Sequence, residues 1–293
     1  MYGKALIATD LSDACAHMLR CAGGLKALGT TDIVLLHCFN IRDVGTLAPS
    51  LMEATRPLLD SQVTQLQSEG FNVSSEMVLG LPQIEIGRQA EERDCSLIVV
   101  GSRGQLMSKE GLLGGVAAGV INSARLPVLV VRVKLTKVDG SVVCEMQEEC
   151  DFLGHVLFVT DFSENAHHAF THVAALAAQG ARRITLLHVQ DRTKLGGHLE
   201  DRLEEFNRID AERLEALSDA LQKRGASDVR IEIQYGIPKK DIVERTKHDE
   251  VSLVVMGRQG RGYLSGFFGG SVSDAVARHA AAPVLLVPMS REL

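Results

Sequence analysis

A glycine-rich segment in the last quarter of the chain has the composition of an anion-binding loop. It contains Gly257, Gly260 and Gly270 and continues into Ser271 and Ser273, where a predicted helix begins. Glycines let the main chain approach a phosphate because they carry no Cβ. The N–H groups and the dipole of a helix N-terminus favour an anion at the same place. The segment therefore predicts a phosphate site, with a serine as the expected cap of the helix.

Side chains of the same loop add charge and hydrogen-bond donors. Arg258 and Arg261 are cationic, and the two serines carry hydroxyl groups. The loop lacks the Gly-Lys-Ser/Thr sequence of a P-loop, and it follows the fourth predicted strand rather than the first, unlike the dinucleotide-binding fingerprint. A flexible connector of the same composition stays open as an alternative at this point.

The elements that position this loop occur twice in the chain. Residues 5–12 match residues 156–163 at an offset of 151, and residues 97–101 match residues 253–257 at an offset of 156. One insertion of five residues in the second copy accounts for both offsets. The chain is therefore a tandem duplication, and each copy must form the same fold.

Each copy alternates short apolar runs with longer segments of helical periodicity. The predicted strands are 5–9, 33–39, 72–79, 96–100 and 127–131, and then 155–160, 183–189, 229–235, 252–256 and 283–287. The clearest helix spans 198–224, with leucines on one face and charges on a solvated face. This order predicts an α/β fold of two tandem doubly wound domains, each a five-stranded mostly parallel sheet with four helices.

The repeat divides the chain into two domains and a linker between them. Residues 1–135 form the first domain, residues 136–152 a linker with room for a short paired segment, and residues 153–293 the second domain. The six cysteines form no CxxC pair and the second copy has none, which argues against a disulfide framework or a zinc site.

Composition excludes several classes of protein. The net charge of -6 argues against a general nucleic-acid binder. No stretch approaches the roughly 18 apolar residues of a membrane span. Since the chain opens directly on a predicted strand, without an export signal, we expect a cytoplasmic protein.

The loop spacing, Gly257-x2-Gly260-x9-Gly270-Ser271, resembles the ATP-binding signature of the universal stress protein family. The Thr-Asp-Phe-Ser turn, the Leu-Leu-His-Val strand end and the final Ala-Pro-Val-Leu-Leu-Val resemble the family as well, and the likeness covers both copies. The resemblance implies a strand order of 3-2-1-4-5. The first and fourth strands then flank the topological switch point, where open α/β sheets bind ligands.

The resemblance implies that the ligand is an adenine nucleotide, ATP or AMP. Any Mg²⁺ would be held mainly by the phosphates. Asp161, directly after Thr160, would contact the ribose. The main chain of Val189 would face the adenine, and Met256 would pack on the ring. The phosphates would be wrapped by Gly257, Arg258, Gly260, Arg261, Gly270, Ser271, Val272 and Ser273. The alternative for Asp161 is a helix cap, and a structural role is expected for His188.

The first copy keeps the glycine spacing but loses the hydroxyl donors. Gly115 and Ala117 stand where the second copy has Ser271 and Ser273, and Glu110 adds a carboxylate that would repel a phosphate. We therefore expect the second copy to hold the nucleotide and the first to be empty or adapted to another ligand.

Three classes of function remain. The leading one is a nucleotide-binding regulatory protein of the stress response, whose protein partner the sequence does not name. The others are a slow ATPase or nucleotidyl-transfer enzyme, and a carrier that holds a small ligand in its first copy. The loop brings no paired carboxylates or nucleophile–base pair with it, so no catalytic residue is assigned.

The final strands of the two copies generate a prediction about assembly. Residues 127–131 and 283–287 are apolar and fall at sheet edges in the implied strand order, where an exposed apolar edge is a liability. The resemblance implies that they cover one another in an intramolecular pseudo-dimer, and that whole chains form homodimers. Small-angle scattering should give the profile of one compact body. A profile of two separated, independently tumbling domains would contradict the pseudo-dimer.

Overall fold

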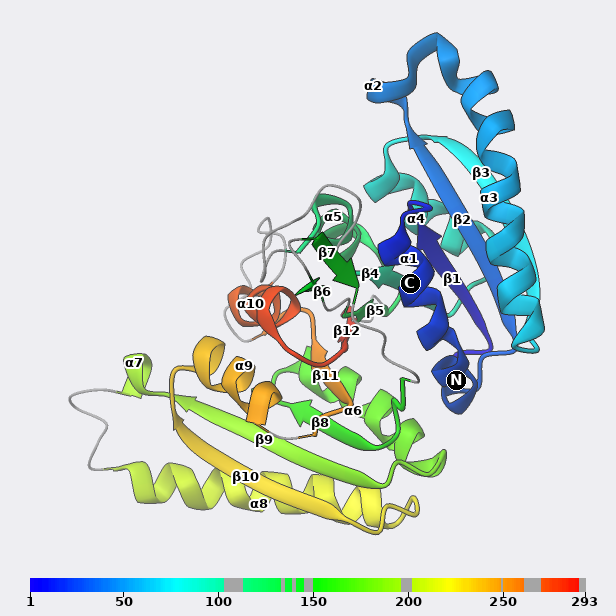
Figure 1. Cartoon of the computed structure of the whole chain (residues 1–293). Helices are drawn as coiled ribbons and strands as arrows, with labels where there is room; N and C mark the ends of the chain where they lie inside the picture. Colours follow the sequence, from blue (N-terminus) through cyan, green and yellow to red (C-terminus); the bar gives the residue numbers. More distant parts are fainter. Residues whose placement is uncertain are drawn as a thin grey trace. The chain divides into compact units, whose positions relative to one another are not determined.

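The computed structural model describes most of the chain: residues 1–102, 113–132, 135–138, 141–144, 150–195, 202–248, 250–260 and 270–289. The chain divides into two compact units, Met1–Cys150 and Asp151–Leu293. Figure 1 shows that each unit contains a sheet flanked by helices.

The first unit is a parallel sheet in the order β3-β2-β1-β4-β5. Helices α1 and α3 pack together, as do α4 and α5. The elements of this unit are β1 (Lys4–Thr9), α1 (Asp13–Arg20), η1 (Cys21–Leu28), β2 (Asp32–Asn40), α2 (Ile41–Val44), η2 (Gly45–Leu47), α3 (Ala48–Ser68), β3 (Asn72–Gly80), α4 (Pro82–Glu92), β4 (Leu97–Gly101), α5 (Gly115–Ser123), β5 (Val128–Val131), β6 (Leu135–Val138) and β7 (Ser141–Cys144).

The second unit repeats this arrangement, with its sheet in the order β10-β9-β8-β11-β12. Helices α6 and α8 pack on one face, and α9 and α10 on the other (Figure 1). Its elements are β8 (His155–Val159), α6 (Glu164–Ala178), β9 (Arg183–Asp191), α7 (Arg192–Leu195), α8 (Leu203–Gln222), β10 (Val229–Gly236), α9 (Pro238–His248), β11 (Leu253–Gly257), α10 (Ser271–His279) and β12 (Val284–Val287). The predicted doubly wound fold and its strand order are confirmed in both units.

The central strands explain why the sheets form. In β8 and β11 every residue is buried, and Phe158 and Val255 have no exposed surface. A parallel sheet covered by helices on both faces requires continuously apolar strands of this kind. The carboxyl ends of these strands therefore project from a rigid core. Among the described helices, none has the length and apolar character needed to cross a bilayer.

The long charged helix differs from its prediction in two ways. Helix α8 ends at Gln222, because Gly225 adopts a φ of 100° shortly after it. The predicted start at 198 lies outside the described residues. Asp210, expected on the solvated face, is instead buried with Leu214 and Leu221.

The predicted linker contains regular structure. Strands β6 and β7 pair antiparallel, with Leu135 opposite Cys144 and Val138 opposite Ser141. The short paired segment that the sequence left room for is this hairpin.

Two cysteines at either end of the first unit are joined. Cys21, the first residue of η1, and Cys150, the last residue of the unit, form a disulfide with a Cα–Cα distance of 4.8 Å. The expectation that cysteine spacing argues against a disulfide is wrong for this pair. The two residues are 129 positions apart, and spacing does not encode which cysteines pair. Cys15 remains a thiol, and burial raises its pKa to about 12.

Replacing Cys150 by Ser should lower the free energy of unfolding of the first unit by about 2–5 kcal/mol. The disulfide closes nearly the whole unit into a loop and so restricts the unfolded chain. Urea titration with and without dithiothreitol measures the loss. The Cys150→Ser variant is the control, since reductant should not destabilise it further. A wild-type first unit of equal stability in both buffers would contradict the prediction.

Candidate functional site

The carboxyl ends of β8 and β11 lie side by side at the centre of the second sheet. Val159 of β8 and Met256 of β11 are register partners. The chain then leaves β8 for α6 on one face and leaves β11 for α10 on the other. This divergence is the topological switch point of the sheet. We call residues 160–163, 257–260 and 270–273 the switch-point site.

The turn after β8 is held by its own side chains. Thr160 Oγ1 accepts a hydrogen bond from the Phe162 N–H at 3.0 Å, and Asp161 Oδ1 accepts one from the Ser163 N–H at 3.0 Å. Ser163 Oγ in turn accepts from the Ala166 N–H and caps α6. The alternative role of Asp161 as the helix cap is therefore excluded, because Ser163 performs it.

A Cβ at either of two loop glycines would come so close to neighbouring atoms that these atoms would have to shift. A Cβ on Gly260 would lie 2.5 Å from Asp161 Oδ2. A Cβ on Gly257 would lie 2.8 Å from Asn165 Nδ2 and 3.2 Å from the Asn165 carbonyl carbon. The turn after β8 and the start of the loop are therefore in close contact. Asp161 and Gly260, predicted separately for the ribose and phosphate sides of the site, lie next to each other.

The main chain of Arg258 joins the two ends of the loop. Its N–H donates to the Val287 carbonyl at 2.8 Å, and its carbonyl accepts from the Gly270 N–H at 3.0 Å. The buried Ser273 hydroxyl lies 2.5 Å from the same carbonyl and 2.8 Å from the Gly270 carbonyl. Ser273 was predicted as a phosphate donor. In the structure its hydroxyl instead joins Arg258 and Gly270, the two residues at the ends of the loop. We call this pair the loop base.

The cap of α10 differs from the prediction. Gly270, with φ −81° and ψ 141°, occupies the cap position and makes no side-chain cap hydrogen bond. The predicted serine cap is wrong because Ser271 begins the helix itself, where it is exposed. A glycine cap offers no side-chain acceptor to the N–H groups of the first turn. Such N–H groups are the donors that bind anions at a helix N-terminus.

Two predicted residues lie on the strands. Val189 and Met256 are both buried. The Leu187 carbonyl accepts from the Thr160 N–H, and alternate residues of a strand direct their main-chain groups to the same neighbour. The main-chain groups of Val189 therefore point to the same side as those of Leu187, past the end of β8. The Arg258 side chain and Val272 are half-buried, and Arg261 lies outside the described residues.

His188 is engaged on both ring nitrogens. Nδ1 donates to the Thr160 carbonyl at 2.8 Å, and Nε2 lies 3.4 Å from Asp210 Oδ2. The same carboxylate oxygen accepts from Gln190 Nε2 at 2.9 Å. Arg213 lies 3.5 Å from the other oxygen and stacks over the Phe162 ring. These contacts fit the structural role expected of His188.

Two residues of this region were missed from the sequence. Asp210 was counted among the charges of α8, although its position four residues before Leu214 places it in the apolar stripe. That position was a usable signal. Asn165 is 1% exposed, and its Nδ2 donates to the Gln259 carbonyl at 3.1 Å. No motif marked it.

The first unit keeps the same frame with different side chains. The Gly114 N–H donates to the Ser102 carbonyl at 3.0 Å, as Gly270 does to Arg258. His37 Nδ1 likewise donates to the Thr9 carbonyl, and burial lowers its pKa. Buried Ala117 stands in place of Ser273 and cannot donate. Glu110, which was predicted to repel a phosphate, lies outside the described residues.

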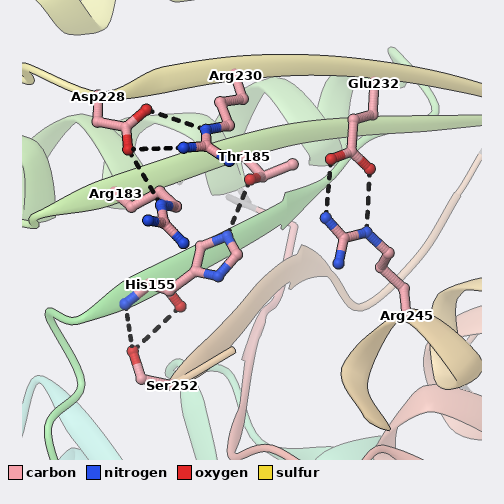
Figure 2. A network of polar contacts seen from close by, with 8 residues as sticks. All are labelled: His155, Arg183, Thr185, Asp228, Arg230, Glu232, Arg245 and Ser252. Atoms are coloured by element: carbon pink, nitrogen blue, oxygen red, sulfur yellow. Dashed lines mark hydrogen bonds and ion pairs between the residues drawn. The ribbon is translucent and has the colours of Figure 1, made fainter. Parts of the chain in front are cut away.

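A second polar network lies toward the amino ends of β8, β9 and β10 (Figure 2). Asp228 pairs with Arg183 at 3.0 Å and with Arg230 at 3.2 Å, and Arg245 makes two hydrogen bonds to Glu232. Burial lowers the pKa of His155, and nearby arginines lower it further. Each arginine drawn is paired with a carboxylate, so we assign the network to stability. The described residues contain no group of three or more potential metal ligands among His, Cys, Asp and Glu.

The fold and the site define a doubly wound α/β protein with a helix N-terminus at its switch point. The profile of the universal stress protein family matches residues 1–132 and 153–288, and the chain belongs to that family as a tandem member.

Three relatives illustrate the match. Universal stress protein MJ0577 of Methanocaldococcus jannaschii is 29% identical over 157 residues, which is 46% of this chain and 97% of that protein. A solved universal stress protein from Archaeoglobus fulgidus covers 99% of this chain and 100% of its own, with a TM-score of 0.77 and 22% identity. That likeness shows the fold. A universal stress protein solved in complex with cAMP covers 45% of this chain and 97% of its own, with 22% identity and a TM-score of 0.36.

Replacing Gly257 by Ala should destabilise the second unit by about 1–3 kcal/mol, because the new methyl group would overlap the start of α6. The control is Gly115→Ala in the first unit. A Cβ there meets nothing within 4 Å, and we expect a change within about 0.5 kcal/mol. Denaturant unfolding measures both. Equal stability of the two variants would mean that Gly257 is not packed against Asn165.

Proposed function

We propose that this chain is a nucleotide-binding regulatory protein of the stress response, and that it holds ATP or AMP at the switch-point site of the second unit. The observation that carries the proposal is the loop base. The Arg258 carbonyl holds Gly270 and Ser273 together, so that a helix N-terminus without a side-chain cap faces the turn containing Asp161. Membership of the universal stress protein family supports the same choice of ligand.

We assign each group at the site a role in binding the nucleotide. The N–H groups of the first turn of α10 would bind phosphate oxygens, and the exposed Ser271 hydroxyl would add a donor. The Asp161 carboxylate would accept hydrogen bonds from ribose hydroxyls. The main chain of Val189 would meet the adenine edge, beside Met256. Glycine at 260 leaves room for this approach, since a side chain there would collide with Asp161.

Binding is favoured over catalysis by the state of His188. Its Nδ1 donates to the Thr160 carbonyl, and its Nε2 points at the Asp210 carboxylate, 3.4 Å away. A general base must reach the proton that it removes, and His188 is committed elsewhere. We therefore expect ATP hydrolysis to be slow, with Mg²⁺ carried by the phosphates.

One observation favours a second role for the first unit. Exposed apolar side chains lie at or after the carboxyl ends of β2 and β3, on the β2 side of the switch point between β1 and β4. They are Ile41, Leu47, Leu51, Leu79 and Ile84. This supports a carrier function for an apolar ligand. Mass spectrometry of molecules that co-purify with the chain distinguishes an apolar ligand from a nucleotide.

Titration calorimetry should give one nucleotide per chain at low micromolar concentration. The first unit lacks the exposed Ser271 hydroxyl, and Ala117 cannot make the bonds with which Ser273 holds the loop ends together. At 0.5–1.5 kcal/mol for each difference, its binding is weaker by about tenfold to a hundredfold. Gly270→Asp should abolish binding, because a carboxylate would occupy the anion position while still capping α10. Ser271→Ala should weaken binding only modestly.

The matched control is Gly114→Asp, which places the same carboxylate at the cap of α5 in the first unit. It should leave the titration unchanged. Two equal sites per chain, or undiminished affinity in Gly270→Asp, would overturn the assignment to the second unit.

A further inference from the structure

Asn165 connects the two sides of the switch-point site. It is the second residue of α6, which follows the Asp161 turn, and its Nδ2 donates to the Gln259 carbonyl 94 residues later in the chain. The Gly257 main chain packs directly against its amide. One buried side chain therefore fixes the distance between the turn after β8 and the entry of the loop.

The orientation of this amide is set by chemistry. A carbonyl oxygen can only accept a hydrogen bond, so the Gln259 carbonyl requires the NH₂ end of Asn165 to face it. Rotating the amide by half a turn would place two oxygens against each other. The Nδ2–Gln259 contact at 3.1 Å is thus the arrangement that the loop demands.

The other end of the amide is unused. Asn165 Oδ1 is buried and has no hydrogen-bond partner among the residues that the structure describes. A buried acceptor without a donor is costly, and such groups are rare in folded proteins. An acceptor kept in this position beside the entry of a phosphate-binding loop indicates that a donor reaches it in another state of the site.

The first copy lacks this group. Applying the offset of 151 residues, Ala14 stands where the second copy has Asn165. The first unit still forms the Gly114–Ser102 contact at its loop base, so the fold does not require the amide. Asn165 therefore belongs with Ser271 and Ser273 to the set of polar groups found only in the copy with the complete loop.

We infer that Asn165 is a positioning residue of the nucleotide site, which holds the loop entry through Gln259 and offers Oδ1 to an N–H donor of the nucleotide-bound state. This inference rests on the proposed function. It adds a residue outside the glycine-rich motif, and it explains how the ribose side and the phosphate side of the site are kept in register.

The test uses the full chain with Asn165→Leu, which keeps the branched shape of the side chain and removes both polar atoms. The affinity for ATP should fall by about tenfold or more, since the loss of a hydrogen bond leaves the Gln259 carbonyl unpaired. The matched control is Thr185→Val, which removes a buried hydrogen bond to His155 in the same unit. It should lower thermal stability and leave ATP affinity unchanged.

A spectroscopic readout keeps the inference testable if Asn165→Leu fails to fold. In the wild-type chain labelled with ¹⁵N-asparagine, the side-chain NH₂ signal of Asn165 should shift when ATP is added. Unchanged affinity in a folded Asn165→Leu chain, or an NH₂ signal that ATP does not move, overturns the inference while the proposed function stands. A wild-type chain that binds neither ATP nor AMP overturns both.

Discussion

The carbonyl oxygen of Arg258 is the point on which the second unit's loop depends. It receives the Gly270 N–H from the far end of the loop and the Ser273 hydroxyl from the first turn of α10. The Arg258 N–H is itself held by Val287 of the neighbouring strand. The two ends of the loop therefore meet at one residue, Arg258, whose N–H is hydrogen-bonded to the sheet. Whatever the loop does between those points, the start of α10 stays at the switch point.

The two copies show how one frame can keep its geometry while its chemistry changes. Main-chain hydrogen bonds at the loop base are the same in both units, because they depend on backbone and not on side chains. The side chains carried by this common backbone differ between the copies. Ala117 stands in place of Ser273, and Ala14 stands in place of Asn165. Duplication thus leaves a copy that folds in the same way without retaining the same set of donors.

The sequence was informative where a pattern repeats and silent where a contact is unique. The alternation of strands and helices followed from the repeated motifs, and the strand order with its switch point followed from the family resemblance that those motifs carry. The cap of α10 was mistaken because two serines flanked the correct position, and only the backbone angles of Gly270 decide it. Asn165 could not be found in advance, since its partner is a main-chain carbonyl 94 residues away and carbonyls have no sequence signature.

The disulfide between Cys21 and Cys150 has a consequence for the order of events during synthesis. Its second cysteine, Cys150, is the last residue of the first unit. When a chain emerges from the ribosome, amino-terminal domains fold first. Cys21 must therefore wait as a thiol until nearly all of the unit has been made. The disulfide therefore forms once the first unit has been completed, and it does not guide the assembly of that unit.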